Sequence, residues 1–217
     1  MLEQPIYALT DPVRLRELVA GHGWATLVSA TGRGGPVVSH LPVIPDPGPD
    51  EGGDGGGGGG DLTIVGHLAR ADAELHELGA HDVVVIVEGP GGYVSPSSYR
   101  AGPYVPTWNF VVAHLHGRPT VLEGAAGYRV LERTVEHFEA DRPEPWRLDT
   151  VADYAREIAP YTTAFRLRPS RVVGKHKLSQ DKPYEVARRV VEALEDGGPH
   201  GNPALAAAMR RVLVPGD

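Results

Sequence analysis

Ile64-Val65-Gly66-His67-Leu68-Ala69-Arg70 is the stretch of sequence from which the rest of this chain can be interpreted. Its apolar run predicts a buried central β-strand over Leu62–Leu68, which brings an imidazole and a guanidinium to the end of that strand. Gly66 leaves room for a flat group to approach the backbone. His67 and Arg70 are three residues apart, so they share a pocket only if the strand bends or ends between them. The alternative is a hydrogen-bonded core histidine next to a surface arginine.

The segments before and after this stretch predict a helix and further strands. Asp11-Pro12 suits the N-cap and first residue of a helix that Gly21 ends. Trp24–Ser29 and Pro36–Val43 are β-prone runs joined by a glycine-rich turn, which predicts a hairpin. Val83–Val87 is apolar at every position, so this run belongs in the interior of a sheet or barrel.

The second half of the chain predicts a turn, more strands and then helices. Gly89-Pro90-Gly91-Gly92 is expected to turn the chain into a loop over Tyr93–Tyr99, and Trp108–Leu115 to pair with Arg118–Leu122. Apolar residues at helical spacing predict helices over residues 125–140, 149–158, 183–194 and 203–213. Alternating residues predict a strand over residues 161–168. Six or seven short antiparallel strands with late helices predict an α+β fold. We expect an antiparallel Greek-key barrel with peripheral helices and with C-terminal helices from about residue 182, forming a single domain over residues 1–217.

One segment cannot contribute to a core. Residues 46–61 include six consecutive glycines, Gly55–Gly60, which predicts a flexible surface loop. A phosphate-binding loop is the alternative, but it would need a Gly-Lys-Ser/Thr ending and a following helix.

Composition limits the classes of function. The chain has no cysteine, which excludes disulfides, iron–sulfur clusters and a cysteine nucleophile. Its formal net charge of −7 argues against the whole chain wrapping nucleic acid. No run approaches the roughly 20 apolar residues of a membrane span, and the N-terminal sequence lacks the order of a signal peptide. We therefore expect a cytoplasmic protein.

The ten histidines differ in their sequence surroundings. Polar or glycine-rich neighbours predict that five of them lie on the surface: His22, His76, His81, His137 and His200. His114 and His116 are two apart on a predicted strand and share a face, which suits either a metal pair or a structural role.

Two further groups could bind a ligand. Basic residues are dense at Arg166, Arg168, Arg171, Lys175, His176 and Lys177, which would complement an anion or protect a solvated strand edge. Trp108 and Asn109 could offer a stacking face and an amide to a flat ring, although an aromatic near a strand end is often part of the core.

Five motifs, taken together, resemble the PaiB family: Ser39-His40-Leu41-Pro42, Gly66-His67-Leu68-Ala69-Arg70, Gly89-Pro90 with Tyr93-Val94-Ser95-Pro96 and Tyr99, Val105-Pro106-Thr107-Trp108-Asn109, and Gly174-Lys175-His176-Lys177-Leu178-Ser179-Gln180. They occur in the family's order from about Tyr7 to Val190. The resemblance implies an FMN-binding split barrel, that is, a homodimer that holds its cofactor at the subunit interface. Members are described as FMN-binding negative transcriptional regulators, and the family also includes haem-dependent piperazate synthases.

The sequence departs from the family pattern at a few positions. Asp72 stands where the family commonly has Asn, Ser98 replaces a Trp, and His176 and Asp181 replace Phe and Asn. Fewer aromatic residues and an added imidazole favour a remodelled pocket over the usual flavin site.

The first functional hypothesis, implied by the resemblance, is an enzyme that uses haem b. It would cyclise N5-hydroxy-L-ornithine, a small amino acid, to L-piperazic acid by forming an N–N bond. His67 would bind the iron, with His40 and His114 as reserves, and Arg70 with Lys175 or Lys177 would pair with the propionates or the substrate carboxylate. The sequence assigns no acid or base for this reaction.

The second hypothesis is an FMN-binding regulator or flavin-dependent reductase. Arg70, Lys175 and Lys177 would then hold the phosphate, and Trp108 and Asn109 would border the flavin ring. A membrane is not an expected partner. Nor is a nucleic acid, since the net charge is negative and no helix-turn-helix pattern with a basic recognition face is present.

Overall fold

The computed structural model describes residues 1–32, 34–46 and 62–213. Apart from Asp46, the glycine-rich segment predicted to be a flexible loop lies outside the described residues. The chain groups into two compact units. Unit 1 comprises Met1–Thr10, Glu88–Ala113 and Val173–Asp217, and unit 2 comprises Asp11–Val87 and His114–Val172. The single domain expected over the whole chain stays a prediction.

Unit 2 is built on an antiparallel sheet. Its strands are β1 (Trp24–Ala30), β2 (Pro36–Pro45), β3 (Ile64–Ala69), the first part of β4 (Val83–Val94), β6 (Thr120–Leu122) and β7 (Thr162–Leu167). Their order across the sheet is β6-β7-β3-β2-β1-β4. The predicted hairpin is confirmed, because β1 and β2 pair from Trp24 with Pro42 to Ala30 with Pro36.

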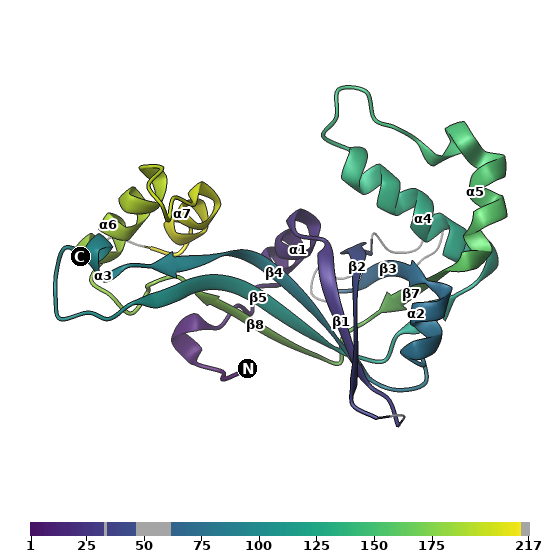
Figure 1. Cartoon of the computed structure of the whole chain (residues 1–217), viewed down its shortest axis with the longest axis horizontal. Coiled ribbons are helices and arrows are strands. Elements are labelled where there is room, and N and C mark those ends of the chain that lie inside the picture. Colours follow the sequence, from purple (N-terminus) through teal and green to yellow (C-terminus); the bar gives the residue numbers. More distant parts are fainter. Residues whose placement is uncertain (33, 47–61, 214–217) are drawn as a thin grey trace. The chain divides into compact units, whose positions relative to one another are not determined.

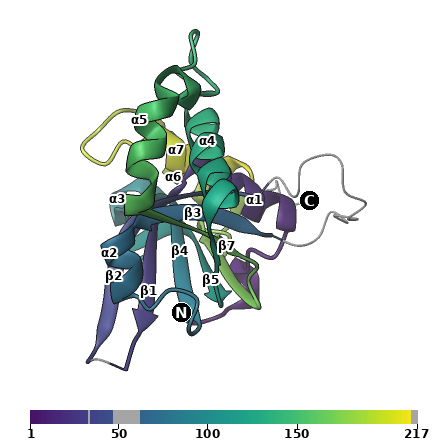
Figure 2. The ribbon, with the colours of Figure 1, turned by 90° about the vertical axis from the view of Figure 1, so that its right-hand side faces the viewer.

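Three helices of unit 2 pack on this sheet: α1 (Pro12–Gly21), α2 (Arg70–Leu75) and α4 (Gly124–Glu139). Helix α5 (Ala152–Ile158) packs against the 3-10 turns at Leu148–Val151 and Ala159–Tyr161. Asp11 caps α1 as predicted, since its carboxylate accepts a hydrogen bond from the Val13 N–H at 2.9 Å. Figures 1 and 2 both show α4 next to β3 and β7 with α5 beside it.

Unit 1 combines strands with the C-terminal helices. It contains the 3-10 turn Pro5–Tyr7, the later part of β4, most of β5 (Thr107–Gly117) and β8 (Arg171–Lys177), α3 (Pro96–Tyr99), α6 (Tyr184–Glu195) and α7 (Pro203–Arg210). Its strand order is β4-β5-β8. Apolar side chains of α6 and α7 form a buried cluster with Val94, Tyr99 and Leu178.

Two local predictions are wrong. Gly89-Pro90-Gly91-Gly92 does not turn the chain, because β4 continues through it to Val94. A Cβ on Gly92 would lie 3.2 Å from the Asn202 and Leu205 side chains, so this glycine admits the start of α7. The predicted pairing of Arg118–Leu122 with β5 is also wrong, since β6 pairs with β7.

None of the helices in the described part of the chain is long and apolar enough to cross a membrane.

Candidate functional site

His67 lies on a sheet face that a helix partly covers. It pairs with Ala164 of β7, which in turn pairs with Leu122 of β6, and register partners in antiparallel strands share a face. Val65 shares this face because it is two residues from His67. Helix α4 packs Val130 against Val65 and Ala164 there. We call this surface the His67 face.

The His67 face continues across β2 and β1. Extending the register of Val43 with Gly66 by one residue places Pro42 opposite His67, and Pro42 pairs with Trp24. On these strands the face is exposed or half-buried and largely uncharged, with Trp24 67% exposed, Val38 55% exposed, and Thr26, His40 and Ile86 nearby in register. His67 therefore lies where the covered part of the face meets the exposed part.

The His67 imidazole is neutral and incompletely bonded. The side chain is half-buried, and among the described residues its buried Nδ1 has no hydrogen-bond partner. Burial lowers the pKa of His67 below its ordinary value, because the charged form loses hydration. A neutral imidazole with a nitrogen to spare is the form of histidine that binds a metal ion.

A hollow of about 680 Å³ opens on the same side of the sheet. Ala164 and Leu122, the residues in register with His67, are part of its wall. Its other walls combine apolar and charged side chains, among them Val121, Tyr128, Leu131, Glu123, Arg70 and Arg156. The volume and the few polar groups are typical of a small-molecule site, for which about 300–1,000 Å³ is usual.

Arg70 reaches the hollow from the start of α2. Strand β3 ends at Ala69 and α2 begins at Arg70, which is the break that the sequence required for His67 and Arg70 to serve one site. The Arg70 Nε donates a hydrogen bond to the Pro160 carbonyl at 2.5 Å, and Pro160 also lines the hollow. Because this hydrogen bond holds the Nε in place, it also fixes the direction of the two terminal guanidinium nitrogens. Two nitrogens in a fixed plane suit a planar anion.

The two reserve histidines have other surroundings. His40 is exposed, and its Nδ1 lies 3.1 Å from the Thr26 hydroxyl while its ring stacks on Trp24. His114 lies on β5 with its ring centroid 6.3 Å from that of His116. The described residues hold no group of three or more His, Asp or Glu side chains arranged to bind a metal ion.

The other predicted site residues lie in unit 1. Lys175 is 8% exposed, and its ammonium donates to the Leu2 carbonyl at 3.1 Å and the Gln4 side-chain oxygen at 3.0 Å. Lys177 donates to the Trp108 carbonyl at 2.9 Å and to the Thr107 hydroxyl, and burial lowers its pKa. An anion would have to displace these neutral partners.

Trp108 and Asn109 are adjacent in sequence but differ in exposure. Trp108 is 60% exposed, and the edge of its ring lies against Tyr93 at a centroid distance of 6.4 Å. Asn109 is fully buried and donates from its amide to the Ser179 hydroxyl at 2.9 Å. Trp108 thus offers a ring face, while the Asn109 amide is committed to the core of unit 1. That these residues converge with His67 on one pocket stays a prediction.

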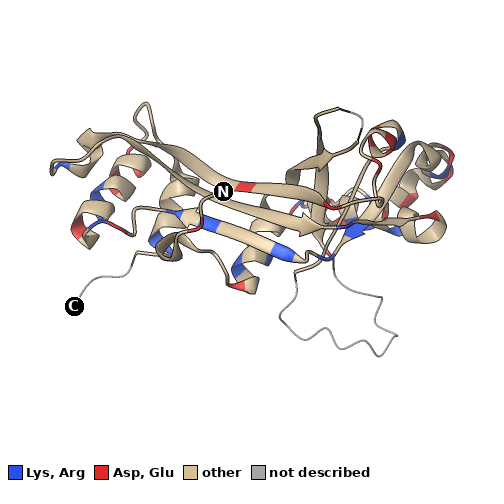
Figure 3. Ribbon diagram, turned by 90° about the horizontal axis from the view of Figure 1, so that it is seen from below, with Lys and Arg blue, Asp and Glu red and all other residues tan. Residues whose placement is uncertain are grey.

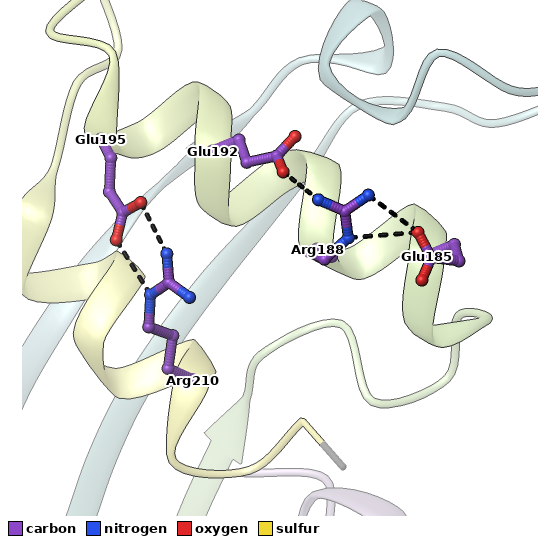
Figure 4. Close-up of polar contacts among 5 residues, drawn as sticks. All are labelled: Glu185, Arg188, Glu192, Glu195 and Arg210. Atoms are coloured by element: carbon purple, nitrogen blue, oxygen red, sulfur yellow. Dashed lines mark hydrogen bonds and ion pairs between the residues drawn. The ribbon is translucent and has the colours of Figure 1, made fainter. Parts of the chain in front are cut away.

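Basic side chains elsewhere are mixed with acidic ones. Figure 3 shows Lys and Arg interspersed with Asp and Glu over the helices. In Figure 4, Arg188 of α6 bonds to Glu185 and Glu192, and Arg210 of α7 bonds to both carboxylate oxygens of Glu195. Paired arginines of this kind do not form a phosphate-binding stripe.

The family of this chain follows from its similarity to known proteins. Residues 1–171 match the model of the family described as "Putative FMN-binding domain". The chain belongs to this FMN-binding domain family. A relative, the protease synthase and sporulation protein PAI 2 of Bacillus subtilis, is 26% identical over 192 residues, which cover 88% of this chain and 87% of that protein. The resemblance to the PaiB family is thereby confirmed.

Solved structures show the same fold. The FAD and heme binding protein of Mycobacterium smegmatis matches with a TM-score of 0.58 at 19% identity over 84% of this chain and 80% of that chain. The flavocytochrome Anf3 of Azotobacter vinelandii matches with a TM-score of 0.54 at 16% identity over 78% and 69%. The predicted α+β antiparallel split barrel is confirmed.

One histidine of this FMN-binding-family chain was misjudged from sequence. His76 was expected on the surface, but it is fully buried and bonds to Ser29 and Ser39. The signal available in the sequence was helical spacing, since His76 is three residues from the apolar Ala73 and so shares its face. The hollow residues Glu123 and Arg156 were also missed, because only packing of α4 and α5 brings them to the site.

The lowered histidine pKa values predict the direction of a pH effect on stability. His67 and His76 both have lowered pKa values in the folded chain, mainly through burial. The unfolded chain binds protons near pH 6.5 while the folded chain does not, so the free energy of unfolding should fall as the pH drops below about 6.5. Urea unfolding at about pH 7.5 and about pH 5.5 measures this loss, and His67→Leu should reduce it. Equal stability at both pH values would contradict neutral buried imidazoles.

Proposed function

We propose that this chain is a haem-dependent enzyme in which His67 binds the iron and the adjoining hollow receives the charged edge of the cofactor together with the substrate. The observation that carries this proposal is the neutral, half-buried imidazole of His67, whose buried Nδ1 has no partner among the described residues. A buried nitrogen without a partner is unfavourable unless a ligand compensates it.

The residues present fit such a group. A planar cofactor with two carboxylates needs an apolar wall, a neutral ligand and cations at one edge. Val121, Leu122 and Leu131 supply the wall, and Arg70 supplies a cation at its edge. The descriptions of the Mycobacterium smegmatis and Azotobacter vinelandii proteins, which name heme, FAD and a flavocytochrome, support a haem or a flavin here.

The proposed reaction converts N5-hydroxy-L-ornithine to L-piperazic acid. The α-amine nitrogen bonds to N5, the N5–O bond breaks, and the oxygen leaves as water with a proton from the amine, so the overall change is loss of one water. A bound haem would supply an iron that activates the hydroxylamine oxygen. Within the hollow, Arg156, which also donates to Asp153, binds the substrate carboxylate. Glu123 accepts the amine proton and passes it to the departing oxygen, which leaves as water.

Absorption spectroscopy and turnover test this function. Protein reconstituted with hemin should show a Soret band, and incubation with N5-hydroxy-L-ornithine should yield a product lighter by one water in mass spectrometry. Hemin with bovine serum albumin is the control for free haem chemistry. Unaltered substrate with fully haem-loaded protein would refute the reaction, while the absence of a Soret band would refute the cofactor.

FMN is the second candidate cofactor. Residues 1–171 belong to a family whose description names FMN binding. If FMN is the cofactor, Arg70 would hold its phosphate, and the chain would be an FMN-binding regulator or a flavin reductase. A flavin absorption doublet in the purified protein, without a Soret band, would favour this alternative.

We also propose that the exposed part of the His67 face is the contact between two copies of the chain. Trp24, Val38 and Ile86 give this surface an apolar character without a formal charge among them. Two copies with a net charge of −7 repel each other least where they meet on such a surface. A second copy would also cover the open side of His67, and the cofactor needs this cover.

A charge on this surface should separate the two copies. Val38→Asp is expected to convert a dimer to a monomer, because two carboxylates would be buried at a symmetric contact. Light scattering after size-exclusion chromatography measures the mass, and Val13→Asp on the exposed side of α1 is the matched control. A dimeric Val38→Asp protein would place the contact elsewhere.

A further inference from the structure

We propose that His76 is a positioning residue, which fixes helix α2 to the sheet and thereby holds the Arg70 guanidinium at the rim of the hollow. The identity of the ligand at Arg70 rests on the proposed function. The contact that His76 controls does not depend on that identity.

His76 uses both ring nitrogens to join α2 to two strands. Its Nδ1 lies 2.7 Å from the Ser29 hydroxyl of β1, and its Nε2 lies 3.0 Å from the Ser39 hydroxyl of β2. The histidine is fully buried and Ser29 is 2% exposed. Because serine hydroxyls can donate or accept, a neutral imidazole satisfies both contacts in either tautomer.

Among the described residues, α2 also packs against β3, β7 and the 3-10 turn Ala159–Tyr161, but its own side chains provide few attachments. The helix has six residues, its N-cap Ala69 provides no side-chain cap, and Ala73 is the buried residue within it. Leu75 is 62% exposed and cannot anchor it. A helix this short is not stable without tertiary contacts. The two hydrogen bonds of His76 attach its C-terminal end to the sheet, as the Arg70–Pro160 bond attaches its N-terminal end.

Arg70 is the first residue of α2, and His76 is the C-cap. The Arg70 Nε bonds to the Pro160 carbonyl, so one end of α2 meets the hollow while the other is bonded to the sheet. Rotation or fraying of α2 would break the Arg70–Pro160 contact and turn the guanidinium away. His76 therefore acts on the ligand through Arg70.

Burial keeps the His76 imidazole neutral. Burial lowers its pKa, the nearby His81 adds to this effect, and Asp72 on the same helix opposes it. The groups that face it from β1 and β2 are the two serine hydroxyls, which carry no charge. The ring can therefore serve as a permanent neutral link near neutral pH.

Nuclear magnetic resonance of the Arg70 side chain tests the inference without a ligand. The Nε–H signal, assigned by its loss in Arg70→Lys, should exchange slowly with water in the parent protein because of the bond to Pro160. In His76→Phe, which keeps an aromatic ring but not the hydrogen bonds, exchange should accelerate severalfold. His76→Gln should partly restore protection, and His81→Ala on the same segment should leave it unchanged.

A double-mutant cycle then tests the consequence for binding. Arg70→Ala and His76→Phe should each weaken hemin or FMN binding about tenfold to a hundredfold, the usual range for a charge-assisted hydrogen bond. The double variant should bind no more weakly than Arg70→Ala alone, because His76 acts only through Arg70. Circular dichroism monitors folding of each variant.

The outcomes separate the two proposals. If the parent protein binds neither hemin nor FMN, the proposed function fails, and the exchange measurement still decides the role of His76. Unchanged Arg70 exchange in a folded His76→Phe protein, or additive losses of affinity in the cycle, would overturn the positioning role. A lower melting temperature with unchanged exchange would show that His76 only packs the core.

Discussion

Replacing His67 with alanine is expected to abolish or shift the Soret band that the protein shows after incubation with hemin. The variant loses the nitrogen that binds the iron, so haem affinity should fall by more than about a hundredfold, since loss of groups that merely orient a metal ligand costs 10–100-fold. The fold should survive, because the buried Nδ1 forms no hydrogen bond among the described residues. Titration of each apo-protein with hemin, followed at the Soret maximum, measures the change.

Matched controls come from the other candidate ligands. His40→Ala removes an exposed imidazole that bonds to Thr26, and His114→Ala removes one that lies beside His116. Both variants should keep the Soret band in position and intensity. An unchanged band in His67→Ala, together with a lost band in either control, would move the iron ligand to that residue and withdraw the site described above.

Placing a methyl group on Gly66 is expected to have the largest effect on stability. A Cβ there would lie 2.8 Å from the Pro42 carbonyl oxygen, 2.9 Å from a Val43 methyl and 3.1 Å from the Phe165 ring. Pro42 and Val43 belong to β2, which pairs with β3 at this point, so the backbone must shift. Overpacking of this kind costs about 1–3 kcal/mol, and Gly66→Val should exceed Gly66→Ala.

Gly21→Ala is the matched control for this prediction. Gly21 is the last residue of α1, and a Cβ there would meet no heavy atom within 4 Å. The same glycine-to-alanine change should be neutral or should stabilise by about 0.4–1 kcal/mol through the unfolded state. Urea unfolding followed by circular dichroism compares the two. If Gly66→Ala unfolds at the same urea concentration as the parent, β2 and β3 do not approach this closely.

Gly66 also ties the fold to the site. It precedes His67, and its missing side chain lets β3 lie against β2 and Phe165 at the point where the His67 face begins to be exposed. A shift of β3 at Gly66 would move the imidazole. We therefore expect Gly66→Ala to weaken haem binding as well, in contrast to Gly21→Ala.

Local signals in the sequence were sufficient for elements whose stabilising contacts are close along the chain. The Asp11 cap of α1 and the hairpin of β1 and β2 depend on residues a few positions apart, and both are confirmed. The turn predicted at Gly89-Pro90-Gly91-Gly92 was wrong, because glycine is common both in turns and where two segments pack closely. Here Gly92 makes room for Asn202 and Leu205, which are more than a hundred residues away in sequence.

The residues of the candidate site also differ in whether the sequence could predict their role. The Gly66–Arg70 motif could be found from sequence because the strand, its histidine and the following arginine are contiguous. The burial of Lys175 beneath Leu2 and Gln4 could not, since no local pattern shows which lysine the N-terminal residues will cover. The same holds for His76, whose partners Ser29 and Ser39 come from two other strands.

By itself, the sequence determined the family, the antiparallel α+β class and the residues that carry the motifs, because each follows from residue type and short-range spacing. Tertiary structure alone decided that His67 has a buried nitrogen without a partner among the described residues, that Arg70 meets a hollow and that Asn109 is committed to the core. Burial and hydrogen-bond partnership depend on which distant strands and helices pack together, and those contacts set the protonation and availability of each side chain.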